Sequence, residues 1–215
     1  GGTEIRALIA IILLSIVVES VAFIWAVIYL RDELGASAFV GGASFALFNG
    51  TMFAGRIVNT PLVARFGQRT SLLASGAGVG LGGLLLIAAE NVPLAVVALA
   101  LIGLGVAGIF PTVMSAAAER LPDRSGALTT VVMTVAYLAF MLTPPAVGWI
   151  AEFSSLRVAM TLVAISGAGI LWLAWRLAPA HVHQAVEIGH PDVADQRIPG
   201  HHPAQVWHAP CTVMS

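Results

Sequence analysis

Six long apolar segments, separated by short polar loops, make up most of the chain. Each is about 20 residues long or longer, which is the length that a helix needs to cross the hydrocarbon core of a bilayer, and apolar residues occupy all of its faces. The strands of a membrane β-barrel would be half as long and would alternate in polarity. The pattern therefore predicts an all-α protein with helices over residues 5–30, 38–59, 70–89, 93–117, 127–150 and 156–177.

The composition places these helices in a membrane. Of the 215 residues, 58% are hydrophobic and 10% are charged, whereas a soluble domain carries about 25% charged residues. Such a chain cannot cover its surface with polar groups, so we predict an integral membrane protein. The net charge of -1 gives no reason to expect a nucleic-acid partner. The single cysteine excludes an intramolecular disulfide.

Arginine is distributed unequally between the two sides of the predicted helices. Arginine concentrates in the cytoplasmic loops of membrane proteins, so we expect the arginine-rich side to be cytoplasmic and both chain ends to lie there. The residues on this side are Arg6, Arg65, Arg69, Arg120, Arg124 and Arg176, with Arg56 just inside it, while Arg31 and Arg157 flank the other side.

The chain changes character after residue 178. Residues 179–215 are polar, rich in proline and aperiodic, and they contain all six histidines. We therefore divide the chain into a six-helix membrane domain, residues 1–178, and a disordered cytoplasmic tail, residues 179–215. The tail histidines and Cys211 match no standard ligand spacing, so we predict no metal site. An accidental extension, such as an out-of-frame reading, is the other explanation of this segment.

Two loop regions are similar to each other. PLVARFGQRTSLL (61–73) and GWIAEFSSLRVAM (148–160) each end one helix, turn within a few residues and start the next. The first lies on the arginine-rich side and the second on the opposite side. Two three-helix repeats of inverted topology would place them in this way, as in the halves of carriers. Chance similarity between short loops is the alternative.

The stretch GRIVNTPLVARFGQRTSLL (55–73) resembles the loop signature of the major facilitator superfamily. Arg65, Gly67 and Arg69 match the signature, while Thr60 and Ala64 replace its glycine and its aspartate. The stretches VIYLRDELGAS (27–37), GLGVAGIFPTVMSAAAERLP (103–122) and LTPPAVGWIAEFSSLRVAM (142–160) are similar to the C-terminal six helices of bacterial members, nearest to the fucose-permease-like group.

The resemblance implies half of a twelve-helix carrier of the bacterial inner membrane, namely helices seven to twelve, with the N-terminal half missing. Arg56, Arg65, Gly67 and Arg69 would belong to its cytoplasmic gate loop. The first, second, fourth and fifth helices of this chain would line the substrate cavity, whose substrate would be sugar-like or else a drug or metabolite.

Glu19 is the strongest candidate for a proton-coupling or substrate-binding residue, because it lies near the middle of the first apolar segment. An ionised carboxylate in hydrocarbon is costly, so such acids usually face a protein interior or a water-filled cavity and carry function. A group that gains a proton on one side and loses it on the other can couple proton flow to transport. The alternative is a neutral glutamic acid with a purely structural hydrogen bond.

Three further residues are polar groups in apolar runs. Asn49 can donate and accept hydrogen bonds in a substrate cavity, or it can bond to a neighbouring helix. Tyr137 is either a ligand-binding phenol or a packed side chain with a satisfied hydroxyl. Arg56 either snorkels towards the cytoplasmic face or forms an ion pair that closes a gate.

Glycines and prolines shape the predicted helices. The G-x-G-x-x-G match over residues 103–108 lies inside a spanning helix and follows no strand, so we do not interpret it as a dinucleotide site. It and the glycines between residues 76 and 83 instead allow helices to approach closely. Pro111, Pro144 and Pro145 remove backbone donors and should kink their helices, to form either a gate or a static bend.

These features predict secondary active transport of a small solute by alternating access, coupled to protons. The partners would be the solute, protons, the lipid bilayer, and either the missing half or a second copy of this chain. A six-helix scaffold or assembly subunit is the alternative function. No nucleophile–base pair or phosphate loop is present in the sequence, so we predict neither an enzyme nor a cofactor.

Overall fold

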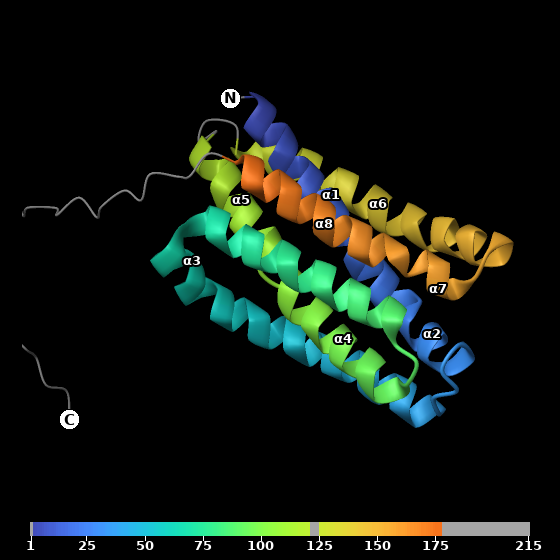
Figure 1. Cartoon of the computed structure of the whole chain (residues 1–215). Coiled ribbons are helices and arrows are strands. Elements are labelled where there is room, and N and C mark those ends of the chain that lie inside the picture. The colour runs from blue at the N-terminus through green and yellow to red at the C-terminus, as the bar shows by residue number, and fades with distance from the viewer. Residues whose placement is uncertain (1, 121–124, 178–215) are drawn as a thin grey trace, which may run out of the picture. The chain divides into compact units, whose positions relative to one another are not determined.

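A computed structural model describes residues 2–120 and 125–177 of this chain, and the predicted tail, residues 179–215, lies outside the described residues. Every element in the described part is a helix (Figure 1). The elements are α1 (Gly2–Ile24), α2 (Ala26–Asp32), α3 (Ala38–Ala88), α4 (Val92–Val106), α5 (Ile109–Arg120), α6 (Ser125–Phe153), α7 (Leu156–Ala159) and α8 (Thr161–Arg176).

The prediction of an all-α membrane fold is confirmed. Among the described residues, five helical stretches are long and apolar enough to cross a bilayer. One of them, α3, has 51 residues and contains both the second and the third predicted helices, so all six predicted spans are present. The helix α1 contacts α5, α6 and α8 and therefore lies centrally among them.

The second and third predicted helices are joined by a reversal at a single residue rather than by the expected loop over residues 64–69. Gly67 has φ 81° and ψ 165°, and the residues on both sides of it are helical. This backbone region is essentially restricted to glycine, because a side chain would clash with the backbone. Gly67 thus divides α3 into a first arm, residues 38–66, and a second arm, residues 68–88, which run in opposite directions (Figure 1).

Two other predicted helices are interrupted but keep their direction. The first span divides into α1 and α2 at Trp25, although the α-type hydrogen bonds continue from Trp25 N to Val21 O (2.9 Å) and from Tyr29 N to Trp25 O (2.8 Å). The fourth span divides into α4 and α5 at residues 107–108. Pro111 explains this second break, because it has no N–H to donate to the carbonyl of Ala107 and its ring crowds that carbonyl.

Three helices begin with a side-chain cap at the end of the bundle opposite the Gly67 reversal. Ser37 accepts a hydrogen bond from Val40 N, Asn91 from Leu94 N and Ser155 from Val158 N. Such caps satisfy backbone donors that have no partner within the helix. The capping residues therefore set where α3, α4 and α7 start.

The second arm of α3 packs through glycine on both neighbours. A Cβ atom at Gly83 would lie 2.6 Å from Ala164 N in α8, and one at Gly76 would lie 2.7 Å from Leu171 N. On its other face, a Cβ at Gly82 would lie 2.6 Å from the Ile102 side chain in α4. These contacts agree with the prediction that the glycines between residues 76 and 83 bring helices close together.

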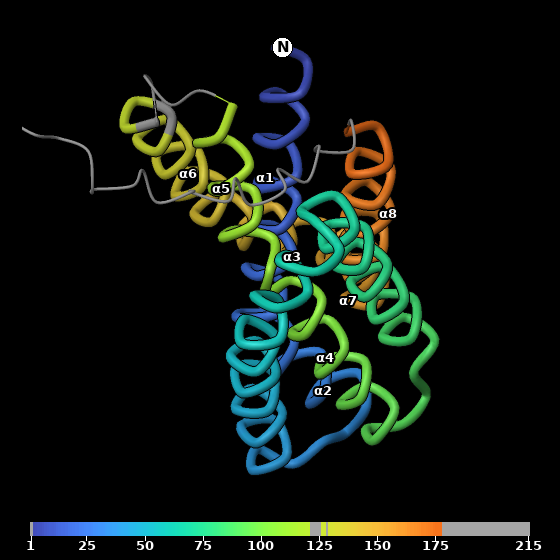
Figure 2. Tube along the Cα trace, turned by 90° about the vertical axis from the view of Figure 1, so that its left-hand side faces the viewer, coloured from blue at the N-terminus to red at the C-terminus, as the bar shows by residue number. Residues whose placement is uncertain are grey.

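The G-x-G-x-x-G stretch has the same packing role. A Cβ at Gly103 would meet Phe48 O in the first arm at 2.7 Å, and one at Gly105 would meet Val79 N in the second arm at 2.8 Å. The helix α4 therefore lies between the two arms of α3, as Figure 2 shows. Its glycines face neighbouring backbone and not a phosphate.

Two arginines support the inverted repeat. Arg69, beside the reversal between the second and third spans, donates to Trp175 O at the end of the sixth span (2.9 Å). Arg157, at the turn between the fifth and sixth spans, donates to Ile87 O (3.2 Å) and Ala89 O (3.1 Å) at the end of the third span. The last carbonyls of a helix have no partner within it. Each repeat thus caps the final helix of the other, as inverted symmetry requires.

Candidate functional site

A pocket of about 340 Å³ brings together three of the residues predicted from the sequence. It lies among α1, the first arm of α3, α5 and α6. These elements correspond to the first, second, fourth and fifth predicted helices, to which the resemblance assigns the substrate cavity. The pocket is lined by Ile16, Glu19, Arg56, Phe110, Met133, Ala136, Tyr137 and Phe140, and we call it the Glu19 pocket.

Both charged residues of the Glu19 pocket lie deep in their helices. Glu19 is near the middle of the helical stretch formed by α1 and α2. Arg56 precedes the reversal at Gly67 by 11 residues (67 minus 56), about 16 Å along the helix axis. That distance is more than half of the roughly 30 Å hydrocarbon thickness. The structure therefore places Arg56 with Glu19 and away from the loop residues with which the sequence grouped it.

Neither charge is neutralised by direct contact. Within the described chain, the side chains of Glu19 and Arg56 form no hydrogen bond and no ion pair of 4.0 Å or less. Arg56 is nevertheless the charged residue that attracts the Glu19 carboxylate electrostatically. Two opposite charges thus face one pocket with space between them, and both can receive a further partner.

Tyr137 and Asn49 differ in their relation to this pocket. Tyr137 lies at the pocket rim, because its side chain is 74% exposed. Asn49 is not among the lining residues, and its amide donates to Phe45 O (2.9 Å) one turn back in the first arm. It precedes Arg56 by two helical turns and so shares that face of the helix. A ligand role for either residue stays a prediction.

The three predicted prolines occupy two kinds of position. Pro111 follows the interruption between α4 and α5, beside the pocket residue Phe110. Pro144 and Pro145 lie inside the uninterrupted helix α6, so the kink predicted there stays a prediction.

Pro144 has a consequence for the pocket that the sequence did not reveal. In a regular helix, residue 144 would donate to Phe140 O, but proline has no N–H. The hydroxyl of Ser20, which is completely buried, donates to Phe140 O instead (3.3 Å). This bond ties α6 to α1 directly beside Glu19. The available signals were a serine next to the acid in the first apolar segment and a proline four residues after an apolar position.

Asn59 is a second residue that the sequence reasoning missed. Its side chain donates to Thr112 Oγ1 of α5 (3.0 Å) and accepts from Ser71 Oγ of the second arm (2.5 Å). It also leaves no room for a side chain at Gly108. One amide therefore joins three segments between the Glu19 pocket and the Gly67 reversal. Its signal was the same as that of Asn49, an amide within an apolar run.

The loop residues matched to the family signature lie at the arginine-rich end and not in the pocket. Arg65 stacks on the Phe66 ring at 5.3 Å, and Arg69 caps α8 as described above. Next to them, Gln68 donates to Glu119 Oε1 of α5 (2.7 Å). These contacts tie helix ends together, and a gating role for Arg65, Gly67 and Arg69 stays a prediction.

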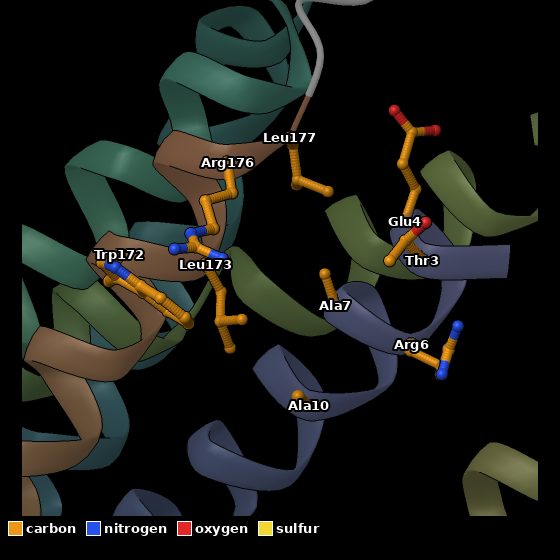
Figure 3. Close-up of a pocket in the computed structure, with 9 residues that line it drawn as sticks. All are labelled: Thr3, Glu4, Arg6, Ala7, Ala10, Trp172, Leu173, Arg176 and Leu177. Atoms are coloured by element: carbon orange, nitrogen blue, oxygen red, sulfur yellow. The ribbon is translucent and has the colours of Figure 1, made fainter. Parts of the chain in front are cut away.

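A second pocket, of about 440 Å³, lies between α1 and α8 at the same end. Arg6 and Arg176 are both among its lining residues, but Figure 3 shows their side chains pointing away from each other. Arg176 stacks over the Trp172 ring at 3.9 Å, and Arg6 donates to Gly2 O (3.2 Å). The two cations therefore do not converge on one ligand.

Comparison with known proteins agrees with this geometry. The family model of the Major Facilitator Superfamily matches residues 7–209. This chain belongs to the major facilitator superfamily. It is therefore a multi-pass membrane protein of a transporter family and not an enzyme.

Two curated relatives of this chain are transporters whose names state no substrate. An uncharacterized transporter of Sinorhizobium fredii is 32% identical over 156 residues, which are 73% of this chain and 41% of the relative. An uncharacterized MFS-type transporter of Yersinia pestis is 26% identical over 141 residues, which are 66% of this chain and 37% of the relative. The chain thus spans less than half the length of these relatives.

Proposed function

We propose that this chain is the C-terminal six-helix half of a proton-coupled secondary carrier that moves a small solute by alternating access. The observation that carries the proposal is the Glu19 pocket, in which four helices converge around an acid and a base that form no ion pair with any described residue. The remaining wall of the substrate cavity would come from an N-terminal half or from a second copy. The coverage of the relatives, 41% and 37%, supports the first of these.

The membrane orientation is part of this proposal. The end that carries Arg65, Arg69, Arg120 and Arg176 would face the cytoplasm of a bacterial cell, and the membrane would be the inner one. The resemblance of residues 27–37, 103–122 and 142–160 supports a place near the fucose-permease-like group of permeases. On this view the Gly67 reversal lies at the cytoplasmic mouth of the cavity.

Glu19 is proposed as the proton-coupling residue. The charged or titratable groups that share its pocket are Arg56 from the first arm and Tyr137 from α6. The helix α4 has no charged residue, and those of α2, α5 and α8 lie at helix ends away from Glu19. A proton that binds Glu19 cancels its attraction to Arg56. This change in charge would bias the equilibrium between the two access states.

The test compares the complete protein containing this chain with its Glu19→Gln variant in proteoliposomes. A panel of organic acids, amines, amino acids and sugars is screened for solute-dependent proton movement with an internal pH dye. We expect one class of solute to move protons in the unaltered protein. In Glu19→Gln, proton-driven accumulation should be lost while exchange of the same solute persists.

Unchanged uphill uptake by Glu19→Gln at every pH would contradict the role of Glu19. Absence of any solute flux in the unaltered protein would instead favour the scaffold alternative. A variant with neither accumulation nor exchange would count against a role confined to proton coupling. Detergent-solubilised Glu19→Gln should elute as a single species, which separates loss of coupling from loss of folding.

A further inference from the structure

The side chain of Arg56 has no hydrogen-bond acceptor among the described residues. Its guanidinium has five N–H donors and stays charged at any relevant pH. None of these donors forms a hydrogen bond with a described residue. An arginine at this depth is expected to pair with an acceptor or to face a water-filled cavity. The guanidinium is therefore available to a ligand in the Glu19 pocket.

Glu19 does not fill this role. A carboxylate that was the structural partner of Arg56 would form a short, often bidentate pair with it. Here no nitrogen–oxygen distance between the two is 4.0 Å or less, although both residues line the same pocket. The acid and the base are close enough to attract each other and far enough apart for each to bind something else.

The rest of the pocket favours an apolar ligand body. Phe110, Phe140 and Met133 contribute aromatic and thioether surface, and Tyr137 provides the one neutral hydrogen-bonding group. A sugar would need a partner for each of several hydroxyls, because an unpaired polar group costs free energy on burial. An aromatic or aliphatic body instead gains from contact with these side chains.

The charge balance of the pocket couples the binding of an anion to the protonation of Glu19. With Glu19 ionised, the pair of charges sums to zero, so a bound carboxylate gives a net charge of minus one in an apolar setting. Uptake of one proton by Glu19 restores neutrality, and the two binding events therefore favour each other. A bound cation would be repelled by the fixed positive charge of Arg56. A zwitterion or a neutral solute would not change the net charge and so would not favour protonation of Glu19.

We infer that the Glu19 pocket binds a small organic anion with an apolar body, whose carboxylate pairs with Arg56 and whose binding is accompanied by protonation of Glu19. This inference rests on the proposed function and adds the substrate class and its coupling, an electroneutral symport of proton and anion. Arg56 becomes a ligand-binding residue in place of the gate residue that its sequence position indicated.

The experiment measures binding, so that it does not depend on transport. The complete protein containing this chain is purified in detergent and titrated with benzoate, phenylacetate and octanoate. Each acid is compared with the alcohol and the amine of the same carbon skeleton. We expect at least one acid to bind, and to bind at least about tenfold more tightly than its alcohol and its amine. Its affinity should rise as the pH falls from 8 to 6, with uptake of one proton per ligand.

The variants assign these effects to residues. Arg56→Gln should weaken the binding of the acid at least about tenfold, and Arg56→Lys should weaken it less, because it keeps the charge but loses the bidentate geometry. Glu19→Gln should bind the acid with no pH dependence between pH 6 and 8. Arg31→Gln, at the opposite end of the bundle and outside the pocket, should bind like the unaltered protein.

Preference for the alcohols or amines, failure of all three acids to bind, or acid binding unaffected by Arg56→Gln would each overturn the inference. These results are distinguishable from failure of the proposed function. Proton-coupled transport of a sugar or an amine would support the proposed carrier function and contradict the binding of an organic anion. Selective binding of an acid without proton-coupled flux would support the anion-binding site and contradict the proposed carrier function. If Arg56→Gln does not fold, the comparison of acids, alcohols and amines on the unaltered protein still decides.

Discussion

The second arm of α3 and the helix α6 belong to the same bundle but are packed in opposite ways. The second arm lies between α4 and α8, where Gly83 and Gly82 leave no room for even a methyl group. In α6, by contrast, 22% of the residues in the most apolar part of the helix are buried. The corresponding share is 44% for α3 and 56% for the stretch formed by α4 and α5. The exposed side of α6 includes Tyr137, Met141 and Leu142.

On the proposed function, this difference separates a part of the molecule that holds its shape from a part that we expect to face a partner or a cavity. Glycine contacts between backbones fix the second arm at close range, since no side chain can rearrange there. The contacts of α6 with α1 include the hydrogen bond that Ser20 Oγ donates to Phe140 O. Glu19 and Arg56 lie on this loosely packed side, where we expect a change in their partners to disturb the fewest packing contacts.

The largest expected effect is on the tightly packed side. Gly83→Ala would place a methyl group 2.6 Å from Ala164 N, and overpacking of this kind destabilises by roughly 1–3 kcal/mol. Thermal unfolding of the detergent-solubilised protein should occur at a clearly lower temperature. Gly50→Ala in the first arm of the same helix, where nothing lies within 4 Å, is the matched control and should not be destabilised. Equal loss in both variants would remove the contrast between the two arms.

The reversal between the arms provides the next test. Gly67→Ala keeps all packing contacts, because nothing lies within 4 Å of the added methyl group. It forces a side chain into a backbone region that costs about 1–3 kcal/mol. We expect a lower unfolding temperature without any change in the packed second arm. Stability equal to that of the unaltered protein would mean that residue 67 does not adopt the glycine conformation.

A smaller effect is expected for the hydrogen bond from Ser20 to Phe140 O, which joins α1 to the loosely packed α6. Ser20→Ala leaves Phe140 O without its partner, at a cost of about 1 kcal/mol. In a Pro144→Ala background, residue 144 can donate to Phe140 O within the helix, so the same serine substitution should cost almost nothing. A double-mutant cycle of unfolding free energies measures this coupling. Additive costs would show that Ser20 and Pro144 act independently.

Much of the fold follows from the sequence, since length and hydrophobicity suffice to locate a spanning helix. The structure contains three features that the sequence predicts: the six apolar helical segments, the packing role of the glycines and the break near Pro111. The tight reversal at Gly67 was missed because a polar, glycine-containing stretch such as 64–69 resembles an ordinary loop. Only the backbone angles at that residue distinguish the two cases.

The candidate site could be predicted only residue by residue. Glu19 and Arg56 each stand out as charges in apolar runs. That both line one pocket depends on how α1 packs against the first arm. Asn49 and Asn59 look alike in sequence, yet the first bonds within its own helix and the second joins three segments. A hydropathy pattern gives the depth of a residue, whereas a site also requires the rotation of each helix.

The most direct test of the account asks whether the exposed side of α6 lines an aqueous cavity. In a Cys211→Ser background, in which these 215 residues contain no other cysteine, single cysteines replace Tyr137 on α6 and Ile165 on α8. Both positions are exposed in this chain, at 74% and 63%, and a thiol reacts with a charged, water-soluble maleimide only where water ionises it. We expect position 165 to face lipid, so labelling in native membranes should modify the cysteine at 137 rapidly and leave the cysteine at 165 unmodified. Equal protection of both positions would place α6 against lipid or a static partner and contradict the cavity.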